Sequence, residues 1–226
     1  MTAKTPKFLK HYTTIEKLYK MLNDKCLFLS DPAKWEDEND FACLEAFRCL
    51  KSKELKTEIQ IGVLCFAEGE ELIHHWNTYA EDGCYIEFDE KEILKEIADP
   101  NFFLHGFVKY KSTKDVTSAY LKGLVAGKKT NTFPFLKRSP YECDKEYRVI
   151  WFGKGKKPAG IPLKKSAIKR ITLSPKIPDA KREKYRKEIK DKFEKQYGKS
   201  GIRVDFSRHL KSDEWITKFK QFSKKR

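Results

Sequence analysis

The segment KFLKHYTTIEKLYKMLNDKCLFLSDP, residues 7–32, predicts a strand–helix–strand unit at the start of the fold. Its central part predicts an amphipathic helix over residues 14–23, because apolar side chains recur at i, i+3, i+4 and i+7: Ile15, Leu18, Tyr19 and Leu22. Thr13 or Thr14 can cap this helix, since a threonine hydroxyl accepts a free backbone N–H of the first turn. The apolar run CLFLS, residues 26–30, predicts the following strand.

The rest of the chain continues with strands and helices. Apolar or alternating runs predict strands at residues 61–68, 83–89, 103–111, 146–152, 167–173 and 201–207. Helical patterns cover residues 40–57, 70–80, 91–99, 179–197 and 212–222. Residues 113–131 fit a helix or a loop, because two glycines weaken the helical pattern. Strands and helices alternate early and the later strands look hairpin-like, which predicts an α+β fold with a mixed sheet.

The positive charge is concentrated in the last third of the chain. Residues 151–226 contain 25 basic and 8 acidic residues, whereas residues 1–150 contain 23 and 25. We therefore expect a core over residues 1–160 and a basic strand–helix–strand–helix layer over residues 161–226, packed on the same domain. Such asymmetry favours contact with a polyanion, so RNA or DNA is the expected partner of residues 151–226. Lysine-rich helices that simply face solvent are the alternative.

The composition also bears on the compartment and on the class of protein. The N-terminus lacks the apolar region of a signal peptide, and no apolar run reaches the ~18 residues of a membrane span. The cysteines are scattered and form no CxxC pair, which favours reduced thiols over a structural zinc site: Cys26, Cys43, Cys49, Cys65, Cys84 and Cys143. We expect a cytoplasmic protein with no membrane contact and no metal. The chain also lacks P-loop, GxGxxG, HExxH and GxSxG motifs.

Three short segments contain the candidate site residues. The first is Lys10-His11-Tyr12-Thr13, at a strand end. The second runs from Trp76 through Tyr79 to Tyr85. The third is YECDKEYR, residues 141–148, which leads through Glu146 and Arg148 into a strand. Each also has a structural explanation. A lone histidine often packs or caps, Trp76 and Tyr79 have the i, i+3 spacing of core residues, and Glu146 with Arg148 could form a surface ion pair of little energetic value.

In this order the segments resemble a large bacterial family of domains of unknown function. The matching text is KHYTTIEKLYKML, LFLSDPAKWEDEND, CFAEGEELIHHWNTYAEDGCYIEFD, YECDKEYRVIWF and IKRITLSP…GIRVDFS, which covers nearly the whole chain. The loop WEDEN, residues 35–39, departs from the family pattern: Glu36 replaces the usual Asn and Glu38 the usual Pro, whereas Asp37 is retained.

That family is in turn similar to ADP-ribosyltransferases of the His-Tyr-Glu type, including DNA-targeting bacterial toxins. The resemblance implies a split mixed sheet with flanking helices and a cleft that holds NAD as substrate, with no metal. It also implies a toxin or phage-defence effector that an antitoxin protein could partner. The implied catalytic residues are His11, Glu146 and Tyr79, with Tyr85 as the alternative aromatic position. The implied NAD-binding residues are His11, Tyr12, Thr13, Trp76, Tyr79, Tyr85 and Arg148.

The implied chemistry suits these residue types. Cleavage of the nicotinamide–ribose bond passes through an oxocarbenium-like state, which the carboxylate of Glu146 could stabilise. His11 with a neighbouring hydroxyl could hold the ribose, and an aromatic face could stack on nicotinamide. Arg148 could orient the carboxylate or bind a diphosphate.

Two other functions compete with the transferase. One is a non-enzymatic nucleic-acid-binding or regulatory module, in which His11 and Glu146 are structural. The other is a nuclease or phosphodiesterase built on His74, His75, Glu70, Glu71 and Asp82. Adjacent histidines on a helix point in different directions, so this set makes a poor metal site.

Overall fold

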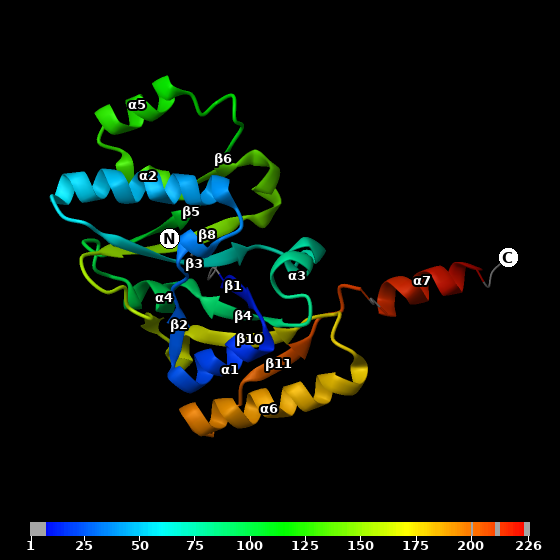
Figure 1. The fold of residues 1–226 in the computed structure, drawn as a ribbon. Helices are drawn as coiled ribbons and strands as arrows, with labels where there is room; N and C mark the ends of the chain where they lie inside the picture. The colour runs from blue at the N-terminus through cyan, green and yellow to red at the C-terminus, as the bar shows by residue number, and fades with distance from the viewer. Residues whose placement is uncertain (1–7, 200, 211–212, 224–226) are drawn as a thin grey trace, which may run out of the picture.

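The α+β class predicted from the sequence is confirmed by the computed structural model, which describes residues 8–199, 201–210 and 213–223 (Figure 1). A seven-stranded sheet runs in the order β11-β10-β4-β1-β3-β8-β5. Its strands are β1 (Phe8–Thr13), β3 (Gln60–Glu68), β4 (Cys84–Asp89), β5 (Phe103–Phe107), β8 (Glu146–Gly153), β10 (Ile168–Leu173) and β11 (Arg203–Phe206). Two small sheets pair β2 (Cys26–Phe28) with β9 (Gly160–Pro162), and β6 (Lys109–Lys111) with β7 (Leu136–Arg138).

The sheet is mixed, as the sequence predicts. Strands β10 and β11 pair in parallel, whereas the other neighbours in the large sheet are antiparallel. The long helix α6 (Asp179–Tyr197) connects the two parallel strands, so the C-terminal part contains the expected β–α–β unit. Because β10 also pairs with β4, this unit extends the same sheet as the N-terminal strands.

The strands β1 and β3 share only a short stretch of pairing. Leu9 pairs with Glu68 and Lys10 with Ala67, whereas β1 pairs with β4 along its whole length. Past Lys10, the ring Nδ1 of His11 donates to the carbonyl oxygen of Cys65 at 2.9 Å. A side chain therefore replaces the backbone ladder where the two halves of the sheet meet.

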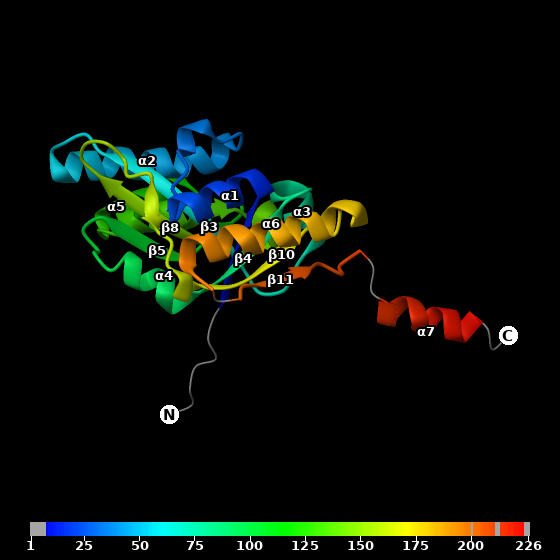
Figure 2. The same ribbon diagram turned by 90° about the horizontal axis from the view of Figure 1, so that it is seen from below.

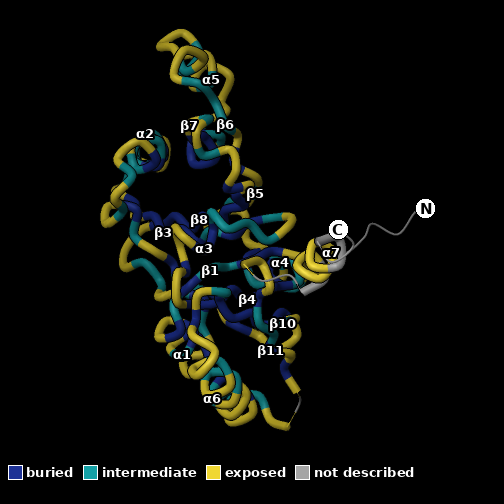
Figure 3. Tube along the Cα trace, turned by 90° about the vertical axis from the view of Figure 1, so that its right-hand side faces the viewer, coloured by how far each residue is buried: buried dark blue, intermediate teal, exposed yellow. Residues whose placement is uncertain are grey.

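Helices cover the two halves of the sheet separately. Helices α1 (Ile15–Asp24) and α6 lie side by side along β4, β10 and β11, and α2 (Glu38–Leu55) lies over the half that contains β3 and β8 (Figures 1 and 2). Thr14 caps α1, accepting from the N–H of Lys17 at 3.2 Å, which settles the two predicted options. The tube in Figure 3 is buried along the strands and mostly exposed along α5 (Ser118–Ala126), α6 and α7 (Asp213–Ser223).

The remaining short elements complete the chain. They are the helices α3 (Ile73–Tyr79) and α4 (Glu90–Glu96) and the 3-10 turns η1 (Pro32–Lys34), η2 (Thr130–Phe135), η3 (Ser139–Asp144) and η4 (Lys165–Ala167). No helix within the described ranges combines the length and the apolar character that a membrane crossing requires.

One predicted strand is divided in two. The segment 103–111 forms β5 and β6, which belong to different sheets. Strand β8 begins at Glu146, whose carbonyl oxygen accepts the N–H of Val108 at 2.9 Å. Past Val108 the chain has no partner left on β8, so it leaves the large sheet and pairs with β7.

Candidate functional site

A buried network of charged side chains surrounds Arg148, in the middle of β8. The guanidinium donates to both carboxylate oxygens of Asp40, from Nη1 at 2.8 Å and from Nη2 at 2.5 Å. It also donates to both oxygens of Glu146, from Nε at 2.6 Å and from Nη2 at 3.0 Å. Arg148 is 0% exposed and Glu146 is 7% exposed. The expectation of a surface ion pair is therefore wrong, although the two side chains do share a strand face.

Lys137 extends this network toward the surface. Its Nζ donates to Glu146 Oε2 at 3.0 Å and to Asp144 Oδ2 at 2.8 Å. Asp144 is also bound from α3, because Tyr79 donates its hydroxyl to Oδ2 at 3.1 Å and His74 donates Nε2–H to Oδ1 at 2.8 Å. The network thus runs from the interior to an exposed edge, where Tyr79 is 43% exposed.

Local structure explains how the carboxylates are placed. Asp37 caps the N-terminus of α2 by accepting from the N–H groups of Asn39 and Asp40, which sets Asp40 in the first turn. Asp144 ends η3, and Lys145 with a positive φ turns the chain into β8. The retained Asp37 of the divergent loop therefore has a structural role.

Cations offset most of the negative charge in the network. Burial alone would raise the pKa of Glu146, but Arg148 and Lys137 outweigh burial and lower the pKa to about 2. Three carboxylates (Asp40, Asp144 and Glu146) and two cations (Lys137 and Arg148) lie within contact of one another. Without its cationic partners, burial of Glu146 would be strongly unfavourable.

A second cluster, of aromatic rings, lies on the same face of the sheet. Tyr12 lies 5.1 Å from Trp76 and 5.3 Å from Tyr85 between ring centroids, and its ring also contacts His75 at 5.0 Å. The indole Nε1 of Trp76 donates to Glu71 at 2.8 Å. Trp76 and Tyr85 are 0% and 2% exposed, so their ring faces are already covered by protein.

His11 and Thr13 lie on the opposite face. Lys10, Ala67 and Glu146 are directly paired across β1, β3 and β8, so they share one face of the sheet. The next residue along β1 therefore points the other way. The His11 ring accordingly contacts the ring of Phe66, at 5.9 Å between centroids. Burial lowers the pKa of His11, against the opposing effect of the Cys65 carbonyl.

Close packing fixes Thr13 at the end of β1. A side chain on Gly83 would place its Cβ 2.1 Å from the carbonyl oxygen of Thr13. Thr13 itself is 4% exposed and is paired with Cys84. Thr13 therefore lies on the face of the sheet opposite the charged network, as His11 does.

The eight predicted site residues are therefore divided between the two faces of the sheet. Six share the face that α3 covers in part: Tyr12, Trp76, Tyr79, Tyr85, Glu146 and Arg148. Within the described residues, no hydrogen bond or ring contact joins His11 to Glu146 or to Tyr79. The interpretation of Tyr79 as a core residue is wrong, whereas that of Trp76 is confirmed. An apolar hollow between α2 and α5, lined by Ala46, Leu50, Leu121 and Val125, contains none of the eight.

Sequence reasoning missed two members of the network, Asp40 and Lys137, and it included Asp144 in the third candidate segment without giving this residue a role. Asp40, on α2, is 108 residues from Arg148, so no spacing pattern connects the two. Lys137 lies only nine residues before Glu146, but it belongs to β7, a separate strand of three residues. The one local signal was the pair Glu146 and Arg148 at i, i+2 within an apolar strand, because such a pair needs further charges if it is buried.

The basic C-terminal third forms an exposed surface along α6. Lysines at positions 181, 184, 187, 190 and 195 are exposed, whereas Ile189 and Phe193 face the core. This surface and the charged network are built by different parts of the sheet, since α6 packs on α1 and β11.

Searches of protein-family models, curated proteins and solved structures with this chain return no match. The arrangement of the residues therefore carries the functional argument.

Proposed function

We propose that the protein is an NAD-dependent ADP-ribosyltransferase that modifies a macromolecular acceptor, with nucleic acid as the preferred class. Tyr79 and Glu146 are its central residues. Of the two aromatic positions that the resemblance implied, we choose Tyr79, whose exposed ring would stack on nicotinamide. Tyr85 is 2% exposed and cannot offer a free ring face without a rearrangement.

The observation that carries this proposal is the link from Tyr79 to Glu146. Asp144 accepts from the Tyr79 hydroxyl, and Lys137 bridges Asp144 and Glu146. This link supports the proposal because a carboxylate held in a fixed position can stabilise an oxocarbenium-like transition state. We propose no ribose contact for His11, because its ring lies on the other face of the sheet, where it holds β1 to β3.

The test is an assay for nicotinamide release and for label transfer. Purified protein is incubated with adenine-labelled NAD and, separately, with DNA, RNA and cell lysate. The wild type should release nicotinamide and label one acceptor class, whereas Glu146→Gln should lose at least the ~100-fold that one electrostatic contact contributes to catalysis. The control is Glu142→Gln, an acidic residue of η3 outside the network.

Loss of the Glu146 carboxylate could also destabilise the buried network. Tyr79→Ala provides a second variant, because Tyr79 is partly exposed and its removal leaves the ion pairs in place. A folded Glu146→Gln protein with full activity would refute the assignment. So would a wild-type protein that neither binds NAD in calorimetry nor releases nicotinamide.

The second candidate function is a nucleic-acid-binding module without catalysis. One observation favours it: both oxygens of Glu146 already accept hydrogen bonds from Arg148 and Lys137, as in a purely structural ion network. This alternative predicts nucleic-acid binding whose affinity falls steeply with salt, together with no NAD binding. Calorimetry with NAD and filter binding with DNA and RNA at several salt concentrations separate the two functions.

A further inference from the structure

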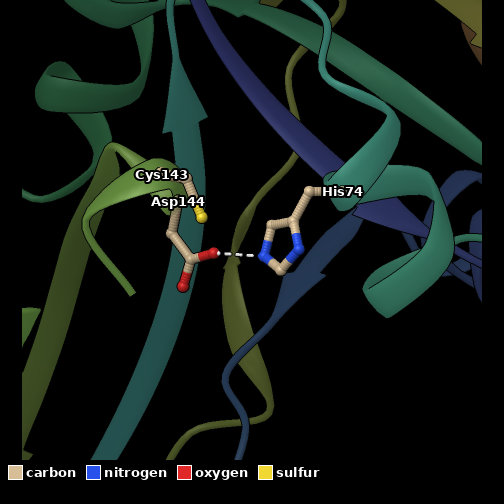
Figure 4. Close-up of side chains that lie close together, drawn as sticks. All are labelled: His74, Cys143 and Asp144. Carbon is tan, nitrogen blue, oxygen red and sulfur yellow. Dashed lines mark hydrogen bonds and ion pairs between the residues drawn. The ribbon is translucent and has the colours of Figure 1, made fainter. Parts of the chain in front are cut away.

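We propose that His74, Cys143 and Asp144 form a zinc-binding site between α3 and η3. In Figure 4 the His74 ring and the Asp144 carboxylate face each other, and the sulfur of Cys143 is directed into the same space. One ligand atom from each residue lies within 4.8 Å of the others. Imidazole, thiolate and carboxylate together form a donor set that suits zinc.

The distances match a site that closes by small side-chain movements. Bond lengths of about 2.0–2.3 Å place the ligand atoms of a tetrahedral zinc site about 3–4 Å apart. His74 Nε2 and Asp144 Oδ1 lie 2.8 Å apart, as a hydrogen bond. On zinc binding the Cys143 thiol would release its proton to solvent, and the neutral His74 ring would carry its single proton on Nδ1, so that Nε2 and the thiolate both direct a lone pair to the metal.

The two oxygens of Asp144 have separate partners. Oδ2 accepts from Lys137 and from Tyr79, whereas Oδ1 faces His74. Lys137 and Tyr79 therefore hold the carboxylate in one orientation, as partners behind a metal ligand do, and leave one oxygen for the metal. The 3% exposure of Asp144 fixes this orientation further, while Cys143 and His74 remain open to solvent.

The charge balance also favours a divalent cation. The three carboxylates exceed the two cations of the network by one negative charge. A Cys143 thiolate would add a second negative charge, and Zn²⁺ would neutralise both. Three protein ligands would leave a fourth position for water, near the Tyr79 hydroxyl.

Zinc competition with a chromogenic chelator tests the site. We expect the wild type to withdraw zinc from the chelator, and we expect Cys143→Ser and His74→Gln to lose most of this affinity. Tyr79→Phe removes only a partner of Asp144 and should weaken binding roughly 10-fold. The matched controls are Cys49→Ser and His209→Gln, which change an exposed cysteine and an exposed histidine elsewhere and should bind as the wild type does.

Cobalt gives an independent readout of the ligands. A cobalt-loaded wild type should show a thiolate-to-metal charge-transfer band in the near ultraviolet, which Cys143→Ser alone among the cysteine variants should lose. Thermal unfolding checks that each variant is folded; both ligand variants change side chains at an exposed edge and should keep the wild-type melting temperature without metal. The proposal would be overturned if the wild type failed to compete for zinc, or if Cys143→Ser and His74→Gln bound zinc as tightly as the wild type does.

Discussion

Arg148 and Asp40 form a bidentate ion pair that joins β8 to the first turn of α2. The two hydrogen bonds measure 2.8 and 2.5 Å, and the partners are 108 residues apart in the chain. Burial raises the pKa of Asp40 against the opposing charge of Arg148. The two hydrogen bonds nevertheless fit an ionised Asp40, because a carboxylic acid would direct its own proton at a guanidinium donor. Through this pair, the helix that covers half of the sheet is attached to the charged network.

Asp40→Asn should lower the free energy of unfolding by about 3 kcal/mol or more, because it leaves Arg148 buried with one carboxylate fewer. Urea denaturation measures the change. Glu45→Gln is the control: it removes a partly exposed i,i+3 pair with Arg48 and should cost less than about 1 kcal/mol. Equal effects of the two substitutions would contradict a buried role for the Arg148–Asp40 pair.

His11→Asn should change how stability depends on pH. The pKa of His11 in the folded protein is lowered by burial, so the unfolded chain takes up a proton first as the pH falls below the ordinary value of 6.5. The wild type should therefore lose stability between about pH 7 and pH 5 through this group, and the variant should lack this component. Urea denaturation at each pH gives the free energy of unfolding of both proteins. If this free energy changes with pH equally in the two, the expected effect is excluded.

His11→Asn also tests the assignment of the faces. Asparagine can still donate to the Cys65 carbonyl, and the residue lies opposite the face of Glu146. If the proposed transferase activity exists, this variant should retain it once folded, while Glu146→Gln loses it. An inactive but fully folded His11→Asn protein would place the histidine back in the catalytic machinery.

Gly83→Ala should be among the most destabilising single changes of a glycine in this chain. Its Cβ would lie 2.1 Å from the Thr13 carbonyl oxygen, so β1 and the start of β4 must separate. Gly123→Ala is the matched control, because nothing lies within 4 Å of its added methyl group. In the interior of α5 that change should instead stabilise the protein by about 0.5–1 kcal/mol. Thermal unfolding of both variants would reveal the opposite signs.

Reversing two charges on α6 should weaken nucleic-acid binding. The double variant Lys187→Glu with Lys190→Glu removes exposed positive charge. It should reduce the slope of log affinity against log salt concentration by about 2. Lys53→Glu with Lys56→Glu makes the same change in net charge at the end of α2. If both pairs act equally, binding follows net charge alone and α6 is not the contact surface.

The strongest sequence patterns predicted their elements well. Strand β8 is buried along its whole length, so its apolar run is almost continuous. Helix α6 and the strands beside it were placed within a few residues, because proline breaks and the helical period agree there. By contrast, β7 and β9 have three residues each and contain no pattern that differs from a loop.

The site was harder to predict because its members meet only in three dimensions. The spacing of Glu146 and Arg148 placed the pair on one face, but its burial depends on two residues outside the strand. Asp40 is 108 residues from Arg148. Lys137 is nine residues before Glu146, on a separate short strand. His11 of β1 was predicted to lie in the NAD cleft with Glu146, because of its position in the His-Tyr-Thr motif. The register of β1 against β3 decides otherwise, and register cannot be read from a single strand.

The strand order of the sheet has a consequence for synthesis on the ribosome. The first hundred residues contain β1, β3 and β4, which can form the centre of the sheet. The outer neighbour of β3 is β8 and that of β4 is β10, and both of these strands are synthesised later. A nascent chain of that length therefore exposes two unpaired strand edges, one on each side, until the flanking strands emerge. Such edges are sites of mispairing and chaperone binding, and the long sequence separations slow folding. Completion of the sheet depends on the last strand, β11, being synthesised.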